Sequence, residues 1–133
     1  MDLINPPAWA AAKGYNNATK ARAGQIICIA GQIAWDEHQQ IVGHGDMVRQ
    51  FDQALANVLT VLTEAGGRPE HLVRLTLFVT EKEAYRRSVR EIGEVYRRRM
   101  GKHFPAMTLV EVSSLLEDDA MIEIEAMAVI ESE

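Results

Sequence analysis

Apolar residues recur at helical spacing in two long segments of the chain. Within residues 46–65 they share one stripe, made of Phe51, Ala54, Leu55, Val58 and Leu62. Asp46 can cap the first turn of this helix, and the glycine pair at 66–67 can end it. Residues 84–100 repeat the pattern with Tyr85, Val89, Ile92 and Tyr96. We therefore predict two helices, at 46–65 and 84–100.

Strands are indicated by alternation and by short apolar runs. Residues 72–80 and 121–130 alternate, so each predicts a strand with two distinct faces. Residues 25–30 form an almost unbroken apolar run after Gly24, which predicts a strand buried on both faces. The other strands that we expect are 17–22, 39–42 and 106–112.

This order of elements predicts an α/β (α+β) fold with the helices on one face of the sheet. Two helices of this length cannot cover both faces. The final strand is apolar on both sides, because Ile122 and Ile124 alternate with Met121, Met127 and Val129. We therefore expect the uncovered face to pack against another copy of the chain.

Composition and length indicate one globular domain, residues 1–133. A 14.8 kDa chain buries about two-thirds of its surface on folding, enough for a core without disulfides. The single cysteine, Cys28, lies in the predicted strand 25–30 and is expected to be an inert core residue. A net charge of −5 disfavours a nucleic-acid or anionic-membrane partner. Without a membrane-spanning run or a secretory signal, the expected location is cytoplasmic.

Common motifs for metal and phosphate chemistry are missing from the sequence. The histidines do not lie at metal-ligand spacing with one another or with the cysteine, so no metal site is expected. Residues 43–46 precede a helix but lack the lysine of a phosphate loop. The arginine-rich part of the second helix predicts either a solvated face or, in part, an anion-binding surface. Its expected i,i+4 ion pairs are Glu83–Arg87, Arg87–Glu91, Arg90–Glu94 and Glu94–Arg98.

Two carboxylates stand out among the polar residues. Glu123 and Glu125 share one face of the final strand with apolar neighbours. A carboxylate buried there is costly unless it is hydrogen-bonded or paired, and a partly buried one is suited to act as a general base. An exposed strand face, or an ion pair across a subunit boundary, fits the pattern equally well.

Several short motifs are similar to those of the RidA (YjgF) family, in the family's order. They are Gly14-Tyr15, Ile29-Ala30-Gly31-Gln32-Ile33, Gln50 with Gln53-Ala54-Leu55-Ala56-Asn57-Val58, Ala65-Gly66, Leu72 to Thr80, Phe104-Pro105-Ala106, and Ile122 to Ala128. The resemblance implies a chorismate-mutase-like fold, a mixed sheet of about six strands with two helices on one face. It also implies a homotrimer with clefts between subunits. The implied activity is that of an enamine/imine deaminase, which hydrolyses its substrate and releases ammonia without metal or cofactor.

The resemblance also implies residue roles. In the family, a glutamate of the last motif positions the attacking water, and Glu123 matches it. Tyr15 matches a tyrosine near the cleft, and Gly31 matches the glycine of a Ser-Gly-Gln turn. Three positions differ: Ala30 replaces the serine, Met107 replaces an arginine that binds the substrate carboxylate, and Leu109 replaces a cysteine. Since Met107 carries no charge, binding of a carboxylate there would lose about 1.5–3 kcal/mol.

Three functions remain open at this point. The first is a deaminase for a larger or less anionic enamine or imine, with Met107, Leu109 and Trp35 forming an apolar wall. Arg90, on the second helix, is a candidate to replace the missing guanidinium. The second is a non-catalytic trimer that binds a small ligand or has a regulatory role. The third is an endoribonuclease, the activity for which some relatives are named, and the acidic composition disfavours it.

Overall fold

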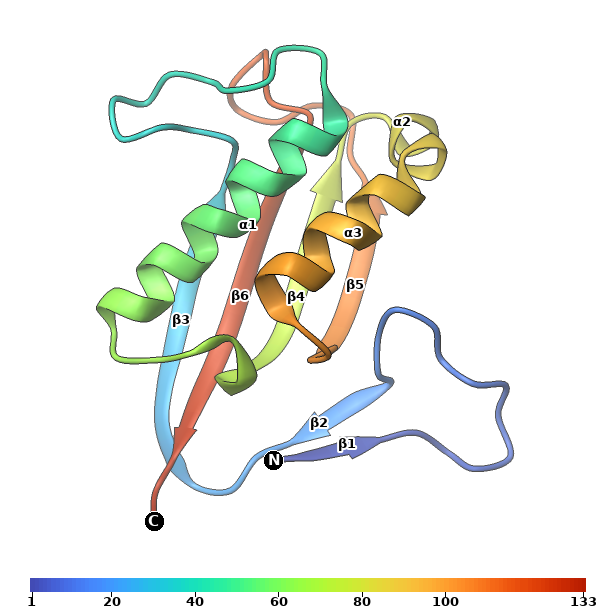
Figure 1. Ribbon diagram of the computed structural model, residues 1–133, viewed down its shortest axis with the longest axis vertical. Coiled ribbons are helices and arrows are strands. Elements are labelled where there is room, and N and C mark those ends of the chain that lie inside the picture. Colours follow the sequence, from blue (N-terminus) through green and yellow to red (C-terminus); the bar gives the residue numbers. More distant parts are fainter.

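The computed structural model describes residues 1–133 and contains two sheets with helices on one side (Figure 1). The larger sheet has the strand order β3-β6-β4-β5, and β1 pairs with β2 in a separate two-stranded sheet. The elements are β1 (Asp2–Ile4), β2 (Ala18–Lys20), β3 (Gly24–Gln32), α1 (Met47–Glu64), β4 (Leu72–Val79), α2 (Lys82–Arg87), α3 (Val89–Met100), β5 (Ala106–Glu111) and β6 (Ile122–Glu131), with a 3-10 turn at Pro69–His71. The predicted mixed α/β fold is confirmed, with its strands divided between two sheets.

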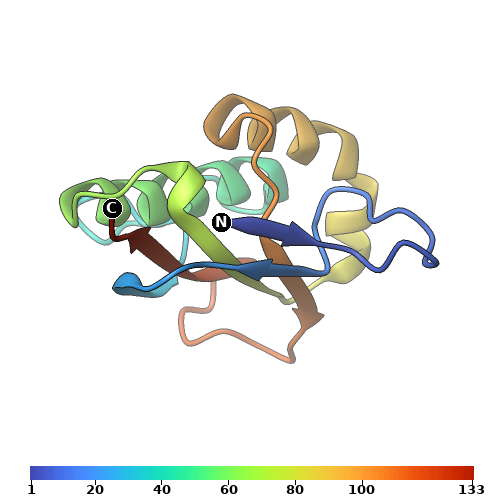
Figure 2. The same cartoon turned by 90° about the horizontal axis from the view of Figure 1, so that it is seen from below.

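Chain connectivity explains why the helices lie on one side. β6 runs antiparallel to both of its neighbours, whereas β4 and β5 are parallel. Parallel neighbours need a crossover connection, and here α2 and α3 supply it. Figure 2 shows all three helices on the same side of the four-stranded sheet. None of these helices has the length and apolar content needed to cross a membrane.

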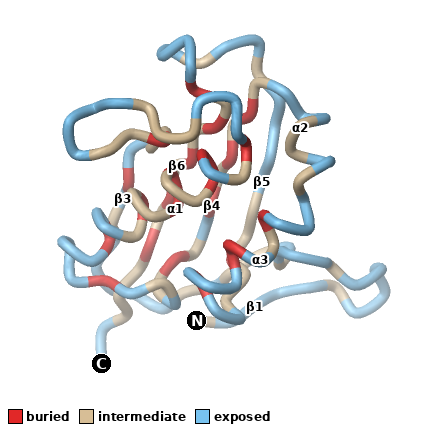
Figure 3. Tube along the Cα trace, turned by 45° about the horizontal axis from the view of Figure 1, so that its top comes forward, coloured by how far each residue is buried: buried red, intermediate tan, exposed pale blue.

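The helix predicted at 46–65 is confirmed as α1. Asp46 accepts a hydrogen bond from the Arg49 backbone N–H at 3.1 Å, which caps the first turn. Gly66 follows the helix with a φ of +87°, a conformation that glycine adopts without strain. The predicted apolar stripe, Phe51, Ala54, Leu55, Val58 and Leu62, is fully buried against the sheet. Figure 3 shows the buried positions gathered along α1, β4 and β6.

The opposite face of the four-stranded sheet has no cover within the chain. We call it the open face; its exposed or half-buried residues include Ile26, Cys28, Phe78, Glu123, Glu125, Met127 and Val129. The prediction that residues 25–30 are buried on both sides is wrong for a single chain, because Ile29 is buried whereas Ile26 is 68% exposed. Cys28 is exposed for the same reason, so the prediction of a core cysteine is also wrong for a single chain.

The second helical segment differs from its prediction in two respects. It is divided at Ser88, which has a φ of −105° and a ψ of 7° and separates α2 from α3. None of the four expected i,i+4 ion pairs forms. Instead, Arg86 pairs with Glu83, and two arginines of the last turn reach Asp52 on α1. The tertiary approach of α1 offers these guanidinium groups a partner that lies outside their own helix.

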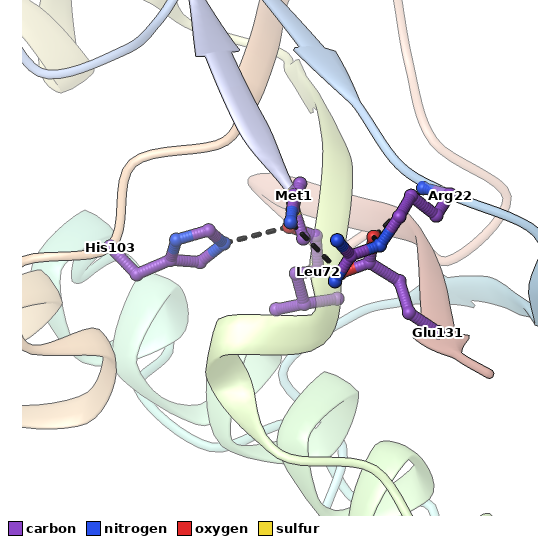
Figure 4. Close-up of polar contacts among 5 residues, drawn as sticks. All are labelled: Met1, Arg22, Leu72, His103 and Glu131. Carbon is purple, nitrogen blue, oxygen red and sulfur yellow. Dashed lines mark hydrogen bonds and ion pairs between the residues drawn. The ribbon is translucent and has the colours of Figure 1, made fainter. Parts of the chain in front are cut away.

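The N-terminal sheet is tied to the main sheet by a few polar contacts. The Thr19 hydroxyl donates to the Val73 carbonyl at 2.8 Å. Glu131 accepts hydrogen bonds from the amino group of Met1 at 2.9 Å and from the backbone N–H of Arg22 at 2.8 Å (Figure 4). These bonds hold the pKa of the Glu131 carboxyl below its ordinary value. β1 was not predicted, and the strand expected at 39–42 is reduced to one bridge between Trp35 and Ile41.

Candidate functional site

A cavity of about 530 Å³ opens between α3 and the β4–β5 edge of the sheet. We call it the α3–β5 pocket. Its walls are mostly apolar, and its size is in the range of small-molecule sites. The residues that line it are Lys13, Gly14, Tyr15, Phe51, Leu55, Leu75, Leu77, Tyr85, Val89, Ile92, Gly93, Tyr96, Arg97, Phe104, Met107, Thr108, Leu109 and Ile124.

The loop between β1 and β2 forms one rim of this pocket. The backbone N–H of Asn16 donates to the Pro105 carbonyl at 3.2 Å, and its side-chain amide donates to the Phe104 carbonyl. Asn5 accepts hydrogen bonds from the backbone and side chain of Asn17, each at 2.8 Å. These bonds fix the end of the loop, and so position the preceding residue, Tyr15, at the pocket.

Packing between α3 and the start of β5 forms the base of the pocket. Tyr96 stacks on Phe104 with ring centroids 5.0 Å apart, and its hydroxyl donates to the His103 carbonyl at 2.6 Å. Burial raises the pKa of Tyr96, so the phenol is even less ionised at neutral pH than an exposed tyrosine. The His103 ring nitrogen Nε2 donates to the Leu72 carbonyl at 2.7 Å (Figure 4). Residues 103–104, which lead into β5, are therefore held in place by both α3 and β4.

Met107 and Leu109 face the helices. In the parallel β4–β5 pair, Met107 is in register with Leu75 and Leu109 with Leu77, and both of these leucines are buried under the helices. Residues side by side in a ladder point to the same face of a sheet. Of the three positions at which the sequence departs from the RidA pattern, Met107 and Leu109 therefore line the α3–β5 pocket, whereas Ala30 does not.

Glu123 lies on the other side of the sheet. It is in register with Phe78, on the open face, where it is half-buried and has no hydrogen-bond or ion-pair partner within the chain. Gly31 is next to it, and a Cβ at position 31 would collide with the Glu123 carboxylate. Glycine at 31 thus leaves the space that this carboxylate occupies. Glu125 lies on the same face and also has no side-chain partner.

The sequence-predicted site residues therefore fall into separate groups. Tyr15, Met107 and Leu109 meet at the α3–β5 pocket, whereas Gly31 and Glu123 meet on the open face. Trp35 does not line the pocket; it lies in the loop after β3, where its carbonyl accepts a hydrogen bond from the Asn57 amide at 2.8 Å. Arg90 is exposed on α3 and does not line the pocket.

Among the pocket residues that sequence reasoning did not assign to a site are Lys13, Gly93 and Arg97. Gly93 did leave a signal in the sequence, because a glycine in the middle of an amphipathic helix is unfavourable and calls for an explanation. Arg97 could not be told apart from the other arginines of its run. Lys13 belongs to a loop whose position depends on contacts far along the chain.

Residues 5–130 match the family model described as Endoribonuclease L-PSP. Among relatives, "Protein DfrA" of Myxococcus xanthus is 33% identical over 115 residues, which cover 86% of this chain and 84% of that protein. A RutC family protein of Pyrococcus horikoshii is 34% identical over 114 residues, with 86% and 85% coverage. The matches thus extend over most of the length of all three chains.

Solved structures are similar over nearly the whole chain. The Rid family protein YyfB of Yersinia pestis has a TM-score of 0.88 and 30% identity, and the match covers 97% of this chain and 98% of that one. The structure of TdcF of E. coli with bound serine has a TM-score of 0.68 and 25% identity, with 98% coverage of both chains.

Proposed function

Because the chain belongs to the Endoribonuclease L-PSP family, which includes the RutC and Rid proteins, we propose that it is a hydrolase that deaminates an enamine or imine. The observation that carries this proposal is the placement of Glu123. A half-buried carboxylate without a partner, beside a glycine that leaves room for it, is free to bind a water molecule. Its position matches the glutamate of the motif that the family uses for this step.

The chemistry asked of Glu123 is proton transfer. The carboxylate would accept a proton from water as the water oxygen forms a bond to the imine carbon. It would then return the proton to nitrogen, which gives a carbinolamine. Transfer of the hydroxyl proton of this intermediate to its nitrogen, again through the carboxylate, would let the carbon–nitrogen bond break, releasing ammonia and leaving a carbonyl product. An enamine would first gain a proton at carbon and lose one from nitrogen, and so become the imine. No step requires a group that changes its oxidation state.

The substrate would be held by two copies of the chain. Glu123 and the α3–β5 pocket lie on opposite faces of one sheet, so a small molecule cannot contact both within a single chain. The open face also exposes apolar side chains that a partner would cover, among them Ile26. These features support an assembly with the site between subunits, the pocket from one copy and Glu123 from the next, and the family resemblance makes a homotrimer the expected form.

The function is tested by ammonia release from enamines generated in the assay. We expect the protein to accelerate release over buffer, and to prefer substrates bulkier and more apolar than 2-aminoacrylate, because Met107 and Leu109 give the pocket an apolar wall. A boiled sample and an unrelated protein of equal concentration are the controls. If no enamine is hydrolysed faster than in buffer, the proposal fails and a ligand-binding trimer becomes the better description.

The assembly is tested by sedimentation together with thiol labelling. We expect a mass about three times that of the 14.8 kDa chain. Cys28, exposed on the open face of a single chain, should react slowly with a maleimide in the native protein and rapidly in urea. A single-chain mass, with Cys28 reacting at the same rate in both conditions, would exclude packing through the open face.

A further inference from the structure

The α3–β5 pocket contains space that the protein itself does not fill. Its lining includes some of the largest side chains of the core, such as Leu55 and Leu75, so the cavity reaches down to the core. Well-packed interiors leave few voids of more than a water molecule in size. A cavity of about 530 Å³ with these walls is therefore suited to an apolar group of the size of a phenyl ring or a short alkyl chain.

Gly93 keeps this space open. It lies inside α3, lines the pocket, and its φ is not in the left-handed region. A Cβ built on it would meet nothing within 4 Å, so no close contact with a neighbouring element requires a glycine there. Glycine is nevertheless among the least favourable residues inside a helix. The presence of a glycine at position 93 is explained if a ligand, rather than a side chain of the protein, occupies the volume next to it.

The charged residues of the pocket are all cationic. Arg97 follows Gly93 by one helical turn, Lys13 comes from the β1–β2 loop, and no aspartate or glutamate lines the cavity. Both side chains are exposed and neither forms an ion pair, whereas Arg98 and Arg99, next along the helix, pair with Asp52. In a chain with a net charge of −5, an apolar pocket with two unpaired cations selects for a negative ligand.

We propose that the α3–β5 pocket binds a small amphipathic anion, with its apolar body against Gly93 and Leu109 and its anionic group between Lys13 and Arg97. This inference rests on the proposed function in taking the bound anion to be the substrate. It assigns carboxylate recognition to Arg97 and Lys13, which line the pocket, and not to Arg90, which does not. Met107 then contributes to the apolar wall, and the loss of an arginine at that position is compensated from α3 and the loop.

The test is calorimetric titration of the full-length protein with stable probes. The probes are 4-phenylbutanoate, its neutral amide and propanoate, which separate the contributions of charge and apolar size. We expect 4-phenylbutanoate to bind, and both other probes to bind at least about tenfold more weakly, since each lacks one of the two contacts. Methyl NMR signals of Leu109 should shift with 4-phenylbutanoate, and those of the fully exposed Leu116 should not.

Variants on α3 identify the contacts. Gly93→Leu should abolish binding of 4-phenylbutanoate by filling the pocket, and Gly93→Ala should raise the melting temperature while weakening binding. Arg97→Gln should weaken binding of 4-phenylbutanoate about tenfold without changing the affinity for the amide. Arg90→Gln is the matched control, because Arg90 is exposed on the same helix, is unpaired and does not line the pocket.

Several results would overturn this inference. Equal affinity for 4-phenylbutanoate and its amide would show that Lys13 and Arg97 do not recognise the anionic group. If Gly93→Leu fails to fold, Arg97→Gln still tests this recognition. Unchanged binding in a folded Gly93→Leu variant would show that 4-phenylbutanoate does not bind in the α3–β5 pocket. Failure of the proposed function is seen separately: 4-phenylbutanoate would bind as described while no enamine released ammonia. Ammonia release without any binding of 4-phenylbutanoate would refute only the inference about the pocket.

Discussion

Replacing Glu123 with glutamine should reduce ammonia release at least about a hundredfold and leave the assembly intact. A positioned general base contributes about 10²–10⁴-fold to a rate, and the amide keeps the size of the side chain but cannot accept the proton of water. Glu123 makes no hydrogen bond or ion pair within the chain, so the substitution removes no structural contact there. The measurement is kcat/KM for the best enamine substrate, together with the sedimentation profile of the variant.

Glu125→Gln provides the matched control for this experiment. Glu125 lies on the same strand and the same face, is also half-buried, and has no side-chain partner. It is in register with Thr76 and is separated from the glycine that makes room for Glu123. We expect its substitution to change kcat/KM only slightly. Equal losses in the two variants would point to the charge of the open face as a whole, and would contradict a specific role for Glu123.

Gln50→Leu should destabilise the protein by about 2–4 kcal/mol, the largest effect on stability that we expect from a single polar side chain here. Gln50 is completely buried. Its amide donates to the carbonyls of Gly43 at 3.1 Å and Asp119 at 3.0 Å, and its carbonyl accepts from the backbone N–H of Met121 at 2.8 Å. Leucine has a similar volume but leaves all three backbone groups without this partner.

Urea unfolding at a fixed protein concentration measures this effect, since assembly makes apparent stability depend on concentration. Gln53→Leu is the control, because Gln53 is only half-buried and its side chain makes one hydrogen bond, to Asn57. We expect that variant to lose about 1 kcal/mol or less. If the two variants were equally stable, the Gln50 network would contribute no more than an ordinary surface contact.

Gln50 also joins α1 to the segment that leads into β6, so a loosened network should disturb Glu123.

The residues of the open face and those of the α3–β5 pocket could be predicted from the sequence to different degrees. The alternation of the final strand singled out Glu123 and Glu125 together, because carboxylates among apolar residues are unusual, and the resemblance to the RidA family then selected Glu123. The assignment of Met107 and Leu109 to an apolar wall is consistent with the structure, since both line the pocket. Arg90 was considered because its helix borders the cleft in relatives, and Trp35 as a further apolar side chain for the wall; neither lines the pocket.

The sequence by itself determined the local structure of this protein. The periodicity of α1, the cap at Asp46, the glycine after its end and the alternation of β4 and β6 depend on residues that are neighbours along the chain, so the pattern alone predicts them. It also determined that one face of the sheet lacks cover, because two helical segments are too few to cover both faces.

Only the tertiary structure decided which residues meet. The exposure of Cys28 and Ile26 depends on which side of β3 receives α1, and the ion pairs of Arg98 and Arg99 depend on how closely α1 approaches α3. The pocket brings together Lys13, Gly93 and Met107, which are far apart in sequence, and separates them from Glu123 by the thickness of a sheet. Such relations arise from the packing of distant segments, to which a local pattern of residues is insensitive.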